Sequence, residues 1–255
     1  MMMRWDALGE TRVAVAGGSA NTLGDASAFL DACTVPLVVH DYSRAAVLGT
    51  ATLVTVEGRL LLVTAAHLFD TGVRFGNLLA PLVGSHEFRS LAGARLLRSC
   101  AADVALIDLS RVAALGELLK GRCAAPVLRA TRRLRPSHRR ESRALLSGYP
   151  ASLSRFCGGW LAARRLTVVT EPRAGGTASG PGLLFHYART APRDDGTWMH
   201  TPELEGMSGA GIWASTSHAA GRALVLRLAA VQSTYVHGRY LRGHDIGAAL
   251  ELLRS

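Results

Sequence analysis

The sequence predicts an all-β protein built from antiparallel sheets, and two observations support this class. From residue 35 onward, short runs of β-branched and apolar residues alternate with turn residues, a spacing typical of antiparallel sandwiches and barrels. With 255 residues, 49% of them apolar, the chain can bury one large core or two small ones. The expected strands are Val35–Val39, Ala51–Val56, Leu60–Thr64, Val104–Leu109, Ala144–Leu146, Leu166–Thr170, Leu183–Tyr187, Gly211–Trp213 and Leu224–Gln232.

The segments around these strands have weaker patterns. Residues 1–33 contain few β-branched runs, and Ala26–Ala32 predicts only a short helical turn, so we expect an N-terminal extension that precedes the fold. Glu57-Gly58 separates two strands and predicts a hairpin turn. Val112–Lys120 predicts either a short helix or an irregular crossing. Ile246–Leu253 places apolar residues near helical spacing, which predicts a short amphipathic helix that closes the chain.

An arginine-rich segment divides the chain at residues 126–143. The net charge of +10 comes almost entirely from arginine, because Lys120 is the only lysine. The basic residues that crowd around Pro136 are Arg132, Arg133, Arg135, His138, Arg139, Arg140 and Arg143. Such a cluster can bind phosphates or an acidic partner. A solvated linker is the simpler interpretation, so nucleic acid is not the expected partner, and residues 34–125 and 144–255 form the two expected units.

The cysteines do not indicate a metal site. Cys33, Cys100, Cys123 and Cys157 are widely separated and form no Cys-x-x-Cys pair, which argues against zinc. A chain of this length does not need a disulfide framework, so we expect reduced, mostly buried thiols. Disulfides in an exported form stay an alternative, and no metal or cofactor is expected.

No targeting or membrane segment is expected. Asp6 and Glu10 interrupt the N-terminal region, which has no apolar centre like that of a secretory signal. The most apolar stretch, Ala223–Val231, contains Arg227 and is far shorter than the ~18 residues of a membrane helix. We therefore expect a soluble cytoplasmic protein that does not associate with membranes.

Three residues in distinct local contexts suggest acyl-transfer chemistry. His67 ends the run Leu61-Leu62-Val63-Thr64-Ala65-Ala66-His67, Asp103 begins the run Asp103-Val104-Ala105-Leu106-Ile107, and Ser208 lies in Gly206-Met207-Ser208-Gly209-Ala210. A serine hydroxyl is a poor nucleophile at neutral pH. It needs an imidazole to accept its proton and a third group that holds the imidazole in the correct tautomer.

The order His, Asp, Ser is that of chymotrypsin-type enzymes and differs from the orders in subtilisins and α/β-hydrolases. Over roughly residues 34 to 250, the chain resembles the trypsin/chymotrypsin-like serine proteases, particularly bacterial members that lack a pro-segment. The Thr-Ala-Ala-His motif that ends at His67 carries this resemblance. The serine motif is similar to the family's Gly-x-Ser-Gly-Gly, with Ala210 in place of the last glycine. The resemblance implies two antiparallel six-stranded β-barrels and a short C-terminal helix.

The resemblance also implies roles for individual residues. His67, Asp103 and Ser208 would be catalytic, with Asp103 favoured over Asp108 because family members have the acid first. The N–H groups of Gly206 and Ser208 would form the oxyanion hole. Met207 stands where zymogen-activated relatives carry an aspartate, so activation by a newly cut N-terminus is not expected.

The substrate site implied by the resemblance lies between residues 202–206 and 231–234. The residues expected to line it are Pro202, Gln232, Ser233 and Thr234, the last three as a strand that pairs with the substrate backbone. Glu203 and Glu205 could attract a basic residue, but they define no specificity.

We therefore expect a serine endopeptidase, a hydrolase that cuts protein or peptide substrates through an acyl-enzyme. A small protease without a sorting signal suggests a dedicated target and a regulatory protein partner that controls access. An alternative is a catalytically degenerate barrel that serves as a binding or scaffold module. An α/β-hydrolase esterase is disfavoured, because that fold needs an acid and then a histidine after the serine, whereas His244 directly precedes Asp245.

Overall fold

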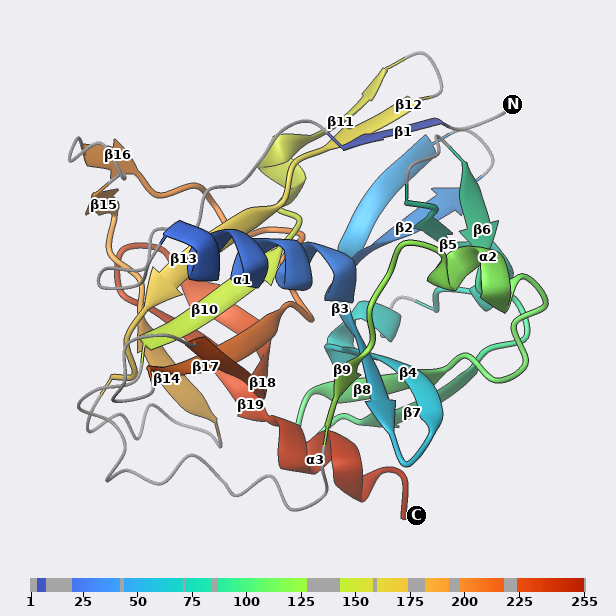
Figure 1. Ribbon diagram of the computed structural model, residues 1–255. Coiled ribbons are helices and arrows are strands. Elements are labelled where there is room, and N and C mark those ends of the chain that lie inside the picture. The colour runs from blue at the N-terminus through green and yellow to red at the C-terminus, as the bar shows by residue number, and fades with distance from the viewer. Residues whose placement is uncertain are drawn as a thin grey trace.

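The chain folds mostly into β-sheets, with few and short helices. The computed structural model describes residues 4–7, 20–41, 44–70, 72–83, 87–127, 143–157, 160–173, 182–192, 198–217 and 224–254. Two large antiparallel sheets lie side by side (Figure 1), one from the N-terminal part of the chain and one from the C-terminal part. Each predicted strand overlaps an observed one, so the all-β class is confirmed.

The N-terminal sheet has the strand order β6-β5-β2-β3-β4-β8-β7, with β9 parallel to β3. Its strands are β2 Thr34–Asp41, β3 Arg44–Val56, β4 Arg59–Thr64, β5 Leu78–Pro81, β6 Phe88–Ser90, β7 Arg95–Ser99, β8 Val104–Asp108 and β9 Ala125–Pro126. Three short helices lie between them, namely η1 Ala66–Phe69, η2 Phe75–Asn77 and α2 Leu115–Leu119. The last of these resolves the 112–120 segment as a short helix.

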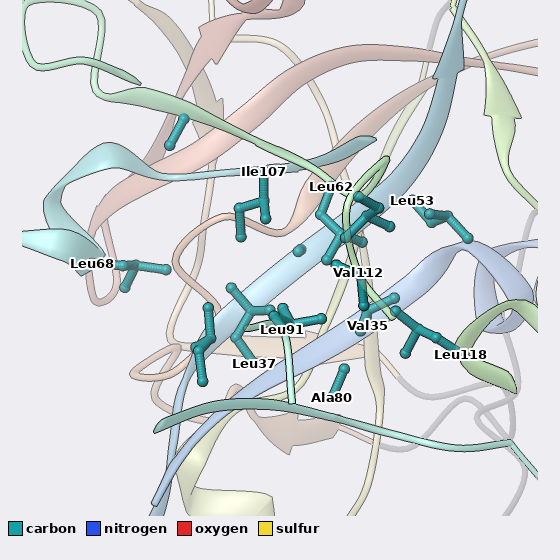
Figure 2. Packing of buried hydrophobic residues seen from close by; sticks show 14 of the residues in the cluster. Val35, Leu37, Leu53, Leu62, Leu68, Ala80, Leu91, Ile107, Val112 and Leu118 are labelled. Carbon is teal, nitrogen blue, oxygen red and sulfur yellow. The ribbon is translucent and has the colours of Figure 1, made fainter. Parts of the chain in front are cut away.

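The β3–β4 hairpin turns at the predicted dipeptide. Glu57 and Gly58 have φ values of 50° and 77°, so both central residues are left-handed, as the tightest hairpin turns require. Val56 pairs with Arg59 across the turn. This register directs Leu62 into a core where Leu37, Leu53 and Ile107 also meet, as Figure 2 shows, whereas Leu61 and Val63 face a second core.

The C-terminal sheet has the order β13-β10-β17-β18-β19-β14. Its strands are β10 Arg143–Gly148, β13 Leu166–Thr170, β14 Leu183–His186, β17 Gly211–Ser217, β18 Leu224–Val236 and β19 Tyr240–Asp245. The two ends of this sheet approach each other. Just after β13, Arg173 N donates to Leu184 O at 2.8 Å, and His186 N donates to Glu171 O at 3.0 Å.

Smaller elements surround the C-terminal sheet. A three-stranded sheet contains β1 Arg4–Ala7, β12 Trp160–Ala163 and β11 Ser154–Cys157, and a separate hairpin contains β15 Thr190–Pro192 and β16 Trp198–His200. The 3-10 helix η4, Ala151–Leu153, precedes β11.

Helix α1, Ala20–Cys33, is longer than the short turn expected from the sequence. Gly24 and Thr22 are weak helix formers, so local propensity underestimates it. Packing against the rest of the protein compensates. Leu30 is fully buried, the Phe29 ring meets Trp213 edge to face at 5.5 Å, and Arg165 Nε lies 2.5 Å from Asp31.

Helix α3, Ile246–Glu251, closes the chain as predicted. The Asp245 side chain accepts a hydrogen bond from Gly247 N at 2.7 Å and caps the helix. Ile246, Ala249 and Leu250 are buried, and α3 contacts β18 of one sheet and β8 of the other. The helix therefore holds the two sheets together.

Residues 128–142, which contain most of the predicted arginine-rich linker, lie outside the described residues. The boundaries of the predicted units stay predictions. Within the described ranges, every helix is too short or too polar to span a lipid bilayer.

Candidate active site

His67 and Asp103 are brought together by the pairing of β4 with β8. Thr64, the last residue of β4, pairs with Ala105, so the residues just beyond these positions lie close together. His67 Nδ1 lies 2.9 Å from Asp103 Oδ2 and 3.0 Å from Oδ1. The His67 backbone N–H also donates to Oδ1 at 2.9 Å. These contacts orient the carboxylate toward both the ring and the main chain of His67.

A turn before β8 positions the Asp103 carboxylate. Asp103 has a φ of 45°, a left-handed conformation that aspartate tolerates better than most residues. Its backbone N–H donates to Cys100 O at 3.3 Å. Asp103 therefore ends a tight turn, and the strand starts at the next residue, as its place in the sequence predicted.

The electrostatics of this pair favour an ionised acid. The hydrogen bond that the His67 ring donates to Asp103 raises the pKa of His67 against the opposing effect of partial burial, and the charges of Asp103 and Asp70 raise it further. Burial tends to raise the pKa of Asp103, but hydrogen bonds from the ring and backbone of His67 outweigh it, so the pKa is lowered. Because Asp103 is an acceptor at neutral pH, the His67 proton resides on Nδ1 and leaves Nε2 as a base.

Ser208 lies on a turn that two glycines make possible. Gly206 and Gly209 have φ values of 84° and 90°, in the region that disfavours residues with a Cβ. Met207 N donates to Leu204 O at 2.9 Å, and Ala210 N donates to Met207 O at 2.8 Å. The Ser208 hydroxyl is half-buried and donates to Ser233 O at 3.4 Å.

This turn packs directly against the N-terminal sheet. Thr50 N, in β3, donates to Ser208 O at 2.9 Å. A Cβ on Gly209 would lie 2.0 Å from Thr64 Oγ1 and 2.9 Å from Ala65 N, so only glycine fits. The serine turn of one sheet therefore meets the end of β4, where the segment that carries His67 begins.

Two backbone N–H groups of the turn are available to a ligand. In the part of the chain that the structure describes, the N–H groups of Gly206 and Ser208 donate to no protein acceptor, whereas those of Met207 and Gly209 do. Two N–H donors that flank a single residue, here Met207, can together bind the negative oxygen of a tetrahedral intermediate.

The two residues in which the serine motif differs from the resembled pattern are both buried. Met207 is fully buried in the C-terminal core, so an apolar side chain anchors the turn. Ala210 is also fully buried and has no positive φ, so its Cβ causes no backbone strain. A Cβ on Gly148 would lie 2.8 Å from the Ala210 Cβ, so the end of β10 packs closely against the residue that precedes β17.

The four residues expected to line a substrate site have different environments. Pro202 is half-buried, and its carbonyl accepts a hydrogen bond from Tyr187. Gln232 is 1% exposed and its N–H donates to Ala210 O at 2.8 Å, so its side chain points into the interior. Ser233 is buried, and Thr234 is exposed. Of the three strand residues, only Thr234 presents its side chain to solvent.

The outer part of β18 has one sheet neighbour among the described strands. Its pairing with β17 starts at Val231, opposite Gly211. From Thr234 to Val236 it pairs with β19. No described strand pairs with the other edge of this stretch, beside Ser233, whose carbonyl accepts from the Ser208 hydroxyl.

Glu203 is already engaged by neighbouring side chains. Tyr235 OH donates to Glu203 Oε2 at 2.6 Å, and His237 Nδ1 lies 2.8 Å from Oε1. These contacts tie the loop before Ser208 to the end of β18. The carboxylate that the sequence offers to a basic substrate residue thus has two protein partners. Glu205 is exposed.

Asp108, the acid that the resemblance disfavoured, is a buried residue at the end of β8. It is 5% exposed, lies 2.5 Å from Arg59 and accepts from Ser110 N at 3.0 Å. Its burial tends to raise its pKa, but hydrogen bonds from Ser110 and Arg59 outweigh that effect and lower it. Asp108 therefore has a structural role at the far end of β8 from Asp103.

One residue at the site has no signal in the sequence. Thr50 lies in the middle of β3 and is fully buried. Besides the N–H bond to Ser208, its hydroxyl donates to Gly206 O at 3.2 Å and accepts from Tyr149 N at 3.0 Å. A threonine within an apolar strand run looks like any β-sheet residue, so only the contact between the sheets identifies it. Within the described ranges, no group of His, Cys, Asp and Glu side chains could hold a metal ion.

Comparisons with known proteins give limited information. No family model matches the chain, and no curated protein matches it. A solved structure from work on the coupled folding and binding of the intrinsically disordered VPg protein of Sesbania mosaic virus has a TM-score of 0.46 and 15% sequence identity. The match covers 84% of this chain and 86% of that one. The assignment of a function therefore rests on the geometry of this chain.

Proposed function

We propose that this protein is a trypsin-like serine endopeptidase that hydrolyses peptide bonds of protein substrates. The observation that carries the proposal is the His67–Asp103 contact, at 2.9 and 3.0 Å to the two carboxylate oxygens, together with the glycine turn that carries Ser208 and packs against the end of β4. The two free N–H groups at Gly206 and Ser208 add an oxyanion site to this pair.

We infer that each large sheet forms a six-stranded barrel. In the C-terminal half, the hydrogen bonds between Glu171–Arg173 and β14 support closure of the six strands into a ring. In the N-terminal half, the strands β2, β3, β4 and β8 each contribute side chains to the core of Figure 2. The proposed catalytic groups then lie where the two barrels meet.

The proposed reaction begins when Ser208 Oγ attacks the carbonyl carbon of the scissile peptide and transfers its proton to His67 Nε2. Asp103 holds the ring and stabilises the imidazolium that forms. The negative oxygen of the tetrahedral intermediate accepts hydrogen bonds from Gly206 N and Ser208 N. His67 then protonates the leaving amine, and water hydrolyses the acyl-enzyme by the same route in reverse. Before attack, the Ser208 hydroxyl must rotate away from Ser233 O, its acceptor in the free protein.

The open edge of β18 supports a mode of substrate binding. A peptide in extended conformation can add to Thr234–Val236 as a further strand, and its main chain then supplies the hydrogen bonds. Such binding places a substrate carbonyl near Ser208 without any contact to a particular side chain. A protein or peptide substrate is thus the class that the geometry favours.

A binding or scaffold module with a vestigial triad is the second candidate. The bond from Ser208 Oγ to Ser233 O favours it, because this hydroxyl is directed to the backbone instead of to His67. Catalytic hydrogen bonds are often long or misaligned in free enzymes and tighten only with substrate. The two candidates differ in whether Ser208 is activated.

A fluorophosphonate probe distinguishes the two, because it labels an activated serine covalently and leaves an ordinary one unmodified. We expect the folded wild type to be labelled at neutral pH, and the label to be lost in Ser208→Ala and His67→Ala. Ser110→Ala is the matched control, since Ser110 is an exposed serine outside the proposed catalytic residues. An unlabelled wild type would favour the binding module. Mapping of new protein N-termini produced by the wild type, but not by Ser208→Ala, would then identify substrates.

A further inference from the structure

Two cysteines that are far apart in the sequence, Cys33 and Cys123, lie on neighbouring backbone segments where α1 ends and β2 begins. Cys33 is the last residue of α1 and is fully buried, whereas Cys123 is exposed in the segment between α2 and β9. Both are free thiols. The proposed catalytic residues do not involve either of them.

Backbone and side-chain contacts hold the two cysteine segments against each other on both sides of Cys33. Cys123 N donates to Ala32 O at 3.1 Å, and the neighbouring Arg122 guanidinium donates to Thr34 O at 3.3 Å. The same guanidinium donates to Pro81 O at 2.6 Å. Residues 122 and 123 therefore bond to the residues on both sides of Cys33, and the Cys123 backbone lies beside it.

The electrostatics of Cys33 agree with this placement. Its pKa is raised by burial and then by the Cys123 thiol, and is lowered by the backbone N–H of Ala125. Cysteines on backbone segments that are hydrogen-bonded to each other need little movement to reach disulfide distance.

We propose that Cys33 and Cys123 form a redox-modification site that closes to a disulfide when the protein meets a low-molecular-mass disulfide oxidant such as oxidised glutathione. The Cys123 thiolate attacks one sulfur of the oxidant, forms a mixed disulfide and releases one glutathione thiolate. The Cys33 sulfur then attacks Cys123 Sγ and releases the second. The two protein thiol protons pass to the two released thiolates, so two protein thiols are oxidised and one oxidant molecule is reduced to two thiols.

The different environments of the two thiols set the order of these steps. Burial raises the pKa of Cys33 to about 12, with a further contribution from the contact with Cys123, and keeps this thiol protonated and shielded. The exposed Cys123 is therefore the entry point for the oxidant. Because Cys33 must lose its proton to attack, the second step accelerates as the pH rises.

The bond would link the end of α1 to the segment that leads into β9. The loop that it closes spans most of the N-terminal sheet, and cross-links over long loops stabilise proteins chiefly by restricting the unfolded chain. For a protein of this size we expect the melting temperature to rise by roughly 5–15 °C.

The test uses the full-length protein, treated at pH 8 with oxidised glutathione, quenched with acid and alkylated. We expect two fewer alkylated thiols, a cross-linked peptide pair that contains Cys33 and Cys123, and a raised melting temperature that a reductant reverses. Cys100→Ser is the matched control, because Cys100 is also exposed, and it should form the same bond. Cys123→Ser should lose both the cross-link and the rise in melting temperature, and as a substitution of an exposed residue it should still fold.

Three results would overturn the proposal. The first is accumulation of a mixed disulfide between Cys123 and glutathione while Cys33 stays reduced. The second is a cross-link from Cys123 to a cysteine other than Cys33. The third is a Cys33–Cys123 bond that lowers the melting temperature, which would mean that the native fold does not accommodate it.

Discussion

Replacement of Asp103 by asparagine is the sharpest test of the proposed triad, because it removes the negative charge of the side chain and keeps its shape. The asparagine can still accept the hydrogen bond that the His67 backbone N–H donates to Oδ1 at 2.9 Å in the wild type. Its amide NH₂ would face Nδ1 and donate to it, which forces the ring proton onto Nε2. The imidazole would then have no lone pair for the Ser208 proton.

The size of the effect follows from the contact distance. At the 2.9 Å between His67 Nδ1 and Asp103 Oδ2, opposite unit charges interact by about 6 kcal/mol at an effective dielectric constant of about 20. The His67 side chain is 39% exposed, so solvent screening reduces this value to roughly 4 kcal/mol. At 1.36 kcal/mol per factor of ten, the labelling rate of Ser208 should fall by about 1,000-fold.

The assay measures the second-order rate of fluorophosphonate labelling against pH for the wild type, Asp103→Asn and Asp108→Asn. Asp108 is the matched control, because it is a buried carboxylate on the same strand but is paired with Arg59. We expect Asp108→Asn to lose stability and to keep the wild-type labelling rate when folded. A folded Asp103→Asn protein that labels within threefold of the wild type, or a folded Asp108→Asn protein with an equal loss, would refute the reasoning.

Three further predictions concern the same site. The pKa of His67 is raised above its usual 6.5 by the hydrogen bond to Asp103, so the labelling rate should rise as the pH increases through that raised value; a midpoint below 6.5 would contradict the assignment. Gly209→Ala should lower the free energy of unfolding by about 3 kcal/mol or more in urea titrations, because its Cβ would lie 2.0 Å from Thr64 Oγ1 at a φ of 90°, whereas Gly116→Ala, with no atom nearby, should be neutral or stabilising. Met207→Asp should destabilise the fold by several kcal/mol and abolish labelling, because it buries an unpaired charge in the C-terminal core; an unchanged melting temperature would show that the turn is held in another way.

The sequence alone identified features that depend on residues close together in the chain. Runs such as Leu60–Thr64 and Leu166–Thr170 form strands because β-branched and apolar side chains fit a pleated, buried surface. Glu57-Gly58 turns because both residues adopt a left-handed backbone there. His67, Asp103 and Ser208 were recognisable as candidates because each lies in a short, distinctive motif.

Only the tertiary structure determined features that depend on partners far away in the chain. Helix α1 has weak local propensity and is stabilised by packing against β3 and β18. In the two large sheets, the strands β5, β6, β7, β9 and β19 were missed, since they are short or are interrupted by arginine, glycine or proline.

The same reason explains the residues whose roles the sequence did not reveal. Thr50, Glu203 and Cys33 have ordinary local contexts, and each acquires its role from contacts across the fold. Thr50 bonds to Ser208, Glu203 bonds to Tyr235, and the segment that ends in Cys33 bonds to the Cys123 backbone. Local sequence encodes backbone preference and side-chain chemistry. The distances between side chains that are remote in sequence are set by how the two sheets pack, and a pattern of neighbouring residues contains no information about them.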